Sequence, residues 1–195
     1  MRFASGTFTM TLPILLSASL LSAAASADMA KVGQPAPRLM LRDLDGRVFS
    51  LADIAYPGPE RPGHQRQPVL LDFFGTHCPP CKAKLPKVIA LHNEKASQGL
   101  MVVMVALLAS EDREAEQKLR DFLARSPVPF PVVLDRFEDV GKRWIYDDNS
   151  LALGTMVLVG ADGTIRAVGV SLDEDFMQAV KAVLPKPTVA TATER

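Results

Sequence analysis

Apolar and polar residues follow one another along this chain in blocks that predict strands and helices in turn. Apolar runs at 69–74, 100–108 and 130–134 predict buried strands, because a strand covered on both faces has few polar positions. Between them, 81–96 and 111–124 repeat apolar side chains every three or four residues, which is typical of amphipathic helices. The alternation predicts an α/β domain whose helices pack on a central sheet.

Turn residues divide the rest of the chain. Segments 39–41 and 48–51 flank Asp45-Gly46, a pair that favours a tight turn and predicts an edge hairpin. The other expected elements are a hairpin of strands 156–159 and 165–170 turned at 161–164, helices at 137–146 and 173–184, and a Pro- and Gly-rich loop at 55–67.

The first residues have the pattern of an export signal. Arg2 precedes an apolar stretch at 10–21, and small residues end in Ala25-Ser26-Ala27, so we expect a signal peptide at 1–27 with cleavage after Ala27. An uncleaved membrane anchor is the alternative, although the stretch is shorter than the ~20 residues that span a bilayer. The domain then covers 28–185, and the tail at 186–195 is predicted to be disordered. We expect a periplasmic or secreted protein.

Charge narrows the choice of partner. The chain has 22 Lys and Arg against 22 Asp and Glu, and its formal net charge is zero. This balance argues against nucleic acid or an anionic membrane surface as the main partner. We expect a monomer without a cofactor or a resident metal.

The two cysteines of the chain, Cys78 and Cys81, lie in Gly75-Thr-His-Cys-Pro-Pro-Cys-Lys82, directly after the strand predicted at 69–74. A helix starting at Pro79 and Pro80 would make Cys78 its N-cap and place Cys81 one turn in. Alpha carbons at this spacing lie roughly 5 to 6 Å apart, as a disulfide requires. So small a closed loop stabilises little, which favours a functional pair.

With these residues in view, the chain resembles the thioredoxin-fold family in its TlpA-like and ResA-like extracytoplasmic branch. The resemblance rests on Val32–Pro37 with Asp43–Gly46, on Phe73–Lys82, and on the hairpin at 158–165. It implies a thioredoxin fold: a central mixed β-sheet flanked by helices, with an N-terminal β-hairpin extension. It also implies thiol-disulfide exchange outside the cytoplasm, for example in cytochrome c maturation, with electrons from a membrane thiol reductant.

Three positions depart from the family pattern: Gly154, His77 and Asp72. Gly154 stands where relatives have a cis-proline that packs over the disulfide and offers a backbone edge to the partner. Gly154 and Thr155 are therefore the expected substrate-binding residues, and a glycine there would leave the site more open. His77 replaces the usual Trp. Its protonated ring would favour the Cys78 thiolate, or it is a solvated loop histidine.

Asp72 lies six residues before Cys78, where many extracytoplasmic relatives have Asn and thioredoxin has Asp. On a buried strand its carboxyl would have a raised pKa and could exchange a proton with Cys81. The alternative is a polar residue near the sheet edge.

These residues predict a mechanism in which the Cys78 thiolate attacks and Cys81 resolves the mixed disulfide. Pro79 and Pro80 have no N–H, so we expect the pKa of the Cys78 thiol to fall only moderately, as in a reductant rather than a strong oxidant.

Three other functions make different demands on the sequence. A metal- or copper-handling module would use Cys78, Cys81 and a histidine from His64, His77 or His92. A non-catalytic interaction domain with a degenerate site would fit the missing proline. A peroxidase of the peroxiredoxin kind would need a Pro-x-x-x-Thr-x-x-Cys frame, which is absent because Thr76 is two residues before Cys78.

Overall fold

A computed structural model describes residues 30–55, 66–109, 112–147 and 150–185 of the chain. Its strands are β1 (Met40–Asp43), β2 (Val48–Ser50), β3 (Val69–Phe74), β4 (Met101–Leu107), β5 (Val132–Asp135), β6 (Tyr146–Asp147), β7 (Ser150–Leu151), β8 (Met156–Val159) and β9 (Ile165–Gly169). Its helices are α1 (Ala52–Ala55), α2 (Pro79–Lys95), the 3-10 helix η1 (Ala96–Gln98), α3 (Ala115–Arg125), α4 (Asp139–Trp144) and α5 (Glu174–Val183). The predicted signal peptide and tail lie outside the described residues. Within those residues, no helix combines the length and apolar character needed to cross a membrane.

Seven strands form one mixed sheet in the order β2-β1-β5-β4-β3-β8-β9. β3, β4 and β5 are parallel, whereas β8 and β1 pair antiparallel with β3 and β5. The β1–β2 hairpin therefore extends one edge of the sheet, and the β8–β9 hairpin forms the other. The predicted α/β class, the mixed sheet and the N-terminal hairpin are confirmed.

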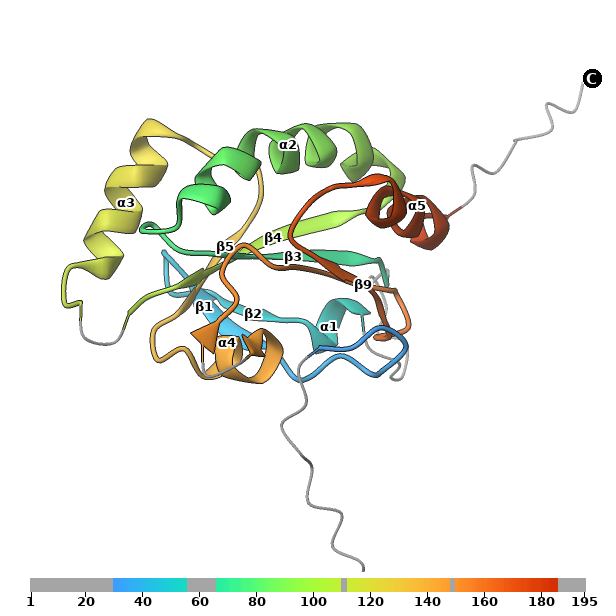
Figure 1. Ribbon diagram of the computed structural model, residues 1–195, viewed down its shortest axis with the longest axis horizontal. Coiled ribbons are helices and arrows are strands. Elements are labelled where there is room, and N and C mark those ends of the chain that lie inside the picture. Colours follow the sequence, from blue (N-terminus) through green and yellow to red (C-terminus); the bar gives the residue numbers. More distant parts are fainter. Residues whose placement is uncertain (1–29, 56–65, 110–111, 148–149, 186–195) are drawn as a thin grey trace, which may run out of the picture.

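Helices cover both faces of this sheet (Figure 1). α2, α3 and α5 pack on one face and α1 and α4 on the other. The six residues of β3 are all buried: Leu70 and Phe74 belong to the α2 side, while Leu71 and Phe73 belong to the α4 side. Because side chains alternate along a strand, Asp72 faces α2, the helix that carries the cysteines.

The edge hairpin turns where the sequence predicts it. Gly46 has a φ of +83°, a backbone conformation that glycine adopts without steric cost. The Asp43 carboxylate accepts hydrogen bonds from the amides of Asp45 and Arg47, both at 2.9 Å, and it pairs with the Arg47 guanidinium. Local side-chain bonds of this kind stabilise the turn independently of the rest of the sheet.

Several element boundaries differ from the prediction. α2 begins at Pro79 with Cys78 as its N-cap, as the cysteine motif predicts, whereas α3 begins at Ala115 rather than 111. Ahead of α3, the Asp112 carboxylate accepts the Glu114 amide at 3.0 Å and holds a turn instead of a helix.

Other elements were not predicted. The short helix α1 occupies the start of the segment expected to be a loop, whose residues 56–65 lie outside the described part. α4 ends at Trp144, because Tyr146 leaves the predicted helix to pair with Leu151 in the small β6–β7 hairpin. The strand predicted at 130–134 is β5, two residues later at its start.

Candidate functional site

The chain leaves the centre of the sheet at the end of β3 and turns directly into α2, which brings the two cysteines to the carboxyl edge of the parallel strands (Figure 1). Cys78 is the N-cap of α2 and has extended backbone geometry, and Pro79 and Pro80 occupy the first helical positions. Proline is compatible there because the first N–H groups of a helix have no intrahelical partner. Cys78 and Cys81 form a disulfide with alpha carbons 5.3 Å apart.

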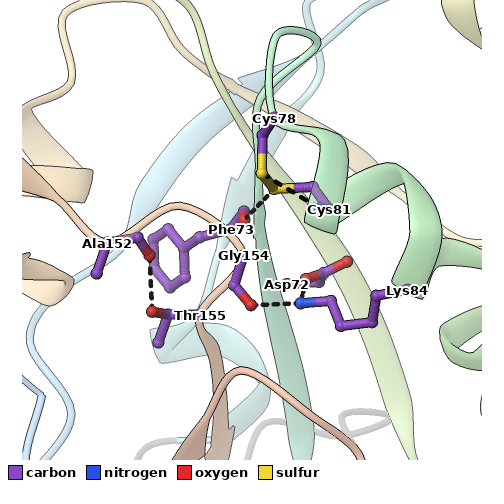
Figure 2. Close-up of a disulfide and its surroundings, with 8 residues drawn as sticks. All are labelled: Asp72, Phe73, Cys78, Cys81, Lys84, Ala152, Gly154 and Thr155. Carbon is purple, nitrogen blue, oxygen red and sulfur yellow. Dashed lines mark hydrogen bonds and ion pairs between the residues drawn. A yellow bond between two sulfur atoms is a disulfide. The ribbon is translucent and has the colours of Figure 1, made fainter.

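The two sulfurs differ in exposure and in their contacts (Figure 2). Cys78 is 5% exposed and Cys81 is fully buried. The Cys81 amide donates to the Cys78 sulfur over 3.2 Å, and the Cys81 sulfur lies 4.0 Å from the Phe73 carbonyl oxygen. Of the two cysteines, Cys78 is therefore the one that keeps contact with solvent.

A buried ion pair lies under the disulfide. The Lys84 ammonium is 2.7 Å from Asp72 Oδ1, and the side chains are 8% and 0% exposed. Burial raises the pKa of the Asp72 carboxyl, and the Lys84 ammonium opposes that rise. Among the described residues, Lys84 is the one charged partner of this carboxylate. The two side chains form an ion pair, but neither carboxylate oxygen accepts a hydrogen bond with acceptable geometry.

Lys84 is the site residue that the sequence analysis missed. It is three residues after Cys81, so both side chains lie on the same face of α2. That spacing was the available signal, but a lysine on a helix is usually solvated, and its burial depends on the segment that covers it.

Gly154 is the part of that segment nearest the disulfide. Its φ is +86°, and a Cβ added there would lie 3.5 Å from the Cys81 sulfur. Its amide donates to the Phe73 carbonyl at 2.9 Å, and its carbonyl accepts from the Lys84 ammonium at 2.5 Å. All described peptide bonds are trans. Gly154 is buried beside Cys81, and the expectation that it leaves the site more open stays a prediction.

Thr155 is also engaged within the fold. Its hydroxyl and its amide both donate to the Ala152 carbonyl, at 2.7 and 3.2 Å, and its carbonyl accepts the Phe73 amide at 3.0 Å. The side chain is 6% exposed. These backbone groups of Gly154 and Thr155 pair with the protein itself, and the role of the two residues in binding substrate stays a prediction.

The histidines lie in different environments. His77 is exposed, and a Cβ on Gly75 would lie 3.1 Å from its ring and 3.2 Å from the Leu153 side chain, so the glycine gives the ring room to lie beside the backbone. His92 packs edge-on against Phe130. His64 is outside the described residues. In the part of the chain that the structure describes, no three His, Cys, Asp or Glu side chains gather to hold a metal.

Comparison with known proteins gives a consistent result. Residues 32–168 match the model of the AhpC/TSA family. A thiol-disulfide oxidoreductase ResA of Halalkalibacterium halodurans is 28% identical over 162 residues, which cover 80% of this chain and 81% of that protein. A ResA of Geobacillus thermodenitrificans is 29% identical over 159 residues, which cover 79% of each chain.

Solved structures show the same fold. A putative thiol:disulfide interchange protein DsbE of Chlorobium tepidum aligns with a TM-score of 0.62 at 23% identity, over 80% of this chain and 99% of that one. A putative thioredoxin of Neisseria meningitidis aligns with a TM-score of 0.57 at 24% identity, over 76% of this chain and 88% of that one. The chain thus belongs to the AhpC/TSA family of thioredoxin-fold proteins, and its class is that of the thiol-disulfide oxidoreductases.

Proposed function

We propose that this protein is an exported dithiol reductant that transfers two electrons from Cys78 and Cys81 to disulfides in protein substrates. The observation that carries the proposal is the unequal burial of the two cysteines at the start of α2, with Cys78 5% exposed and Cys81 fully buried. A helix N-terminus favours negative charge, so Cys78 is suited to attack as a thiolate and Cys81 to resolve the mixed disulfide.

The reaction takes two displacements. The Cys78 thiolate attacks one sulfur of the substrate disulfide, and the other substrate sulfur leaves as a thiolate. Cys81 then transfers its proton to the Asp72 carboxylate and attacks the Cys78 sulfur. The bond between Cys78 and the substrate breaks, the second substrate thiolate leaves, and the Cys78–Cys81 disulfide forms.

The proposed role as a reductant, rather than an oxidant, rests on how few hydrogen-bond donors stabilise the Cys78 sulfur. Pro79 and Pro80 supply no N–H, and the Cys81 amide is the donor that the described residues place on it. A thiolate stabilised by few donors belongs to a less oxidising couple. The expected potential is near that of thioredoxin, about −270 mV, and far from the roughly −120 mV of strong periplasmic oxidants.

The cell compartment and the partners are part of the proposal. The leader-like segment at 1–27 and the resemblance to the ResA-like branch support export and a role such as cytochrome c maturation, with a membrane thiol reductant as donor. Three exposed residues, His77, Pro79 and Pro80, surround the accessible sulfur. We expect a substrate to contact these residues and the segment at 153–155.

Two experiments test the proposal. Titration of the mature protein against glutathione should give a potential near that of thioredoxin, and the reduced protein should reduce insulin. A potential as high as that of the strong oxidants would contradict the reductant assignment. Separately, Cys81→Ser should retain substrates covalently on Cys78, while Cys78→Ser serves as the control and should retain none.

A further inference from the structure

Lys84 is held by two groups that are far apart in the sequence. Its ammonium lies 2.7 Å from Asp72 Oδ1 on β3 and 2.5 Å from the carbonyl oxygen of Gly154, and Figure 2 shows it between them. A buried lysine is costly unless its charge is paired. The Gly154 peptide lies beside the Cys81 sulfur and Asp72 faces the helix that carries it, which makes this placement relevant to the exchange reaction.

The cluster is close to the resolving sulfur. A Cβ on Gly154 would lie 3.5 Å from Cys81 Sγ, so the peptide that accepts from Lys84 also covers that sulfur. Cys81 and Lys84 project from the same face of α2, and Asp72 faces that helix from the sheet. The Lys84 ammonium thus links the Asp72 carboxylate to the peptide that lies over the Cys81 sulfur.

Few other ionisable groups face Asp72. Its neighbours across the sheet are Met104 on β4 and Met156 on β8. From α5, the side chains buried on this face are Phe176 and Val180. In the described part of the chain, Lys84 is the ionisable group that contacts Asp72, and Cys81 is buried on the same side of the sheet.

We propose that Lys84 is a positioning residue of the exchange reaction: its ammonium keeps the Asp72 carboxylate ionised beside Cys81 and anchors the Gly154 peptide over the resolving sulfur. This inference rests on the proposed function and deepens it. Lys84 does not touch the substrate; it acts through Asp72 and Gly154.

The step affected is the second displacement. The Cys81 thiol gives its proton to Asp72, which becomes a neutral acid, and the sulfur keeps the electron pair with which it attacks Cys78. The Cys78–substrate bond breaks and the substrate sulfur leaves with that bond pair. Without the ammonium, burial raises the pKa of Asp72 further, so a larger share of the carboxyl is protonated and cannot accept the proton. The first attack, by Cys78, does not need Asp72.

The reagent 5,5′-dithiobis(2-nitrobenzoate) separates the two displacements. Attack by Cys78 on it releases one thionitrobenzoate, and attack by Cys81 on the resulting mixed disulfide releases a second. The test variant is Lys84→Gln, which removes the charge but keeps an N–H donor for the Gly154 carbonyl. Lys87→Gln is the matched control, because Lys87 is exposed on the same helix.

In Lys84→Gln we expect the rate of the first thionitrobenzoate release to stay within about twofold of the wild type. The rate of the second release should fall about tenfold for each unit by which the pKa of Asp72 rises above the assay pH. The midpoint of the pH profile of the second release should move to higher pH. Asp72→Asn/Lys84→Gln has neither charge of the pair. Its second release should also be slow, but the rate should not change with pH through the titration of residue 72. Lys87→Gln should match the wild type.

Two results would overturn the inference: a second release in Lys84→Gln with wild-type rate and pH profile, or equal slowing of both releases, which marks a structural role only. If Lys84→Gln does not fold, Asp72→Asn/Lys84→Gln serves as the test. A second release at the wild-type rate in this double variant also overturns the inference. Failure of the proposed function is distinct, since the wild type itself would then have the potential of a strong oxidant or leave insulin oxidised.

Discussion

Replacing Lys84 by Met should destabilise the oxidised protein by an amount that depends on pH. The substitution removes the ammonium 2.7 Å from Asp72 Oδ1 and leaves a carboxyl whose side chain is 0% exposed. Methionine is similar in length and apolar, so packing changes little. Removing one partner of a buried pair costs about 3–5 kcal/mol, and we expect a loss of this size at pH 7.

The sign of the pH dependence follows from Asp72. Burial raises the pKa of its carboxyl in the folded protein above that in the unfolded chain, and removal of Lys84 raises it further. The folded variant then binds the Asp72 proton more tightly than the unfolded chain does. The contribution of Asp72 to the free energy of unfolding is therefore fully present below the pKa of the unfolded chain, about 3.9, and is lost as pH rises through the folded pKa. The slope is at most about 1.4 kcal/mol per pH unit. A loss of 3–5 kcal/mol therefore develops over about 2–4 units above pH 4.

Urea unfolding of the oxidised protein at pH 4 to 8 measures this profile. Asp72→Leu/Lys84→Met should regain most of the loss at pH 7, because apolar side chains replace both charges together. Lys87→Met, on the exposed face of α2, should stay within about 0.5 kcal/mol of the wild type. An equal loss for Lys84→Met at pH 4 and pH 7 would refute the reasoning, because a packing defect does not titrate.

Three further substitutions test single features of the fold by urea unfolding. Gly154→Ala should cost about 1–2 kcal/mol from backbone strain at a φ of +86°, and a neutral effect would show that the backbone there relaxes. Gly141→Ala should cost about 1–3 kcal/mol, because its Cβ would lie 2.4 Å from Leu107 Cδ2; an unchanged midpoint would show that the leucine moves aside freely. Asp173→Ala removes the cap that accepts the Phe176 amide at 3.0 Å and should cost about 1 kcal/mol with a shorter α5 by circular dichroism; no loss would show that the cap is dispensable.

The parts of the fold that could be predicted depend on local chemistry. The apolar run of β3 indicates a central strand, and the edge hairpin turns at Gly46 because glycine and two aspartates bond within the turn itself. The N-cap role of Cys78 is predictable for the same reason: the donor is the amide three residues later. Interactions between residues three or four apart can be predicted from the local sequence, because both partners lie within it.

The element boundaries that differ from the prediction depend on pairing with residues outside the predicted element. Tyr146 fits the helical pattern of 137–146, but it pairs with Leu151 in β6–β7, and Ala152 donates its amide to the Ile145 carbonyl across that hairpin. Helix α1 has four residues, too few to show a period. Competition between such arrangements is decided by packing rather than by propensity.

The amino-acid order alone was enough to indicate the cysteine pair, the strand that delivers it and the α/β class, because each depends on neighbours within one turn or one strand. The burial of Lys84 depended on tertiary structure. Its contact with Gly154 joins residues 70 apart, and its contact with Asp72 needs α2 to lie on the sheet. A lysine is solvated or buried according to what covers it, and that covering exists only after distant segments have packed together.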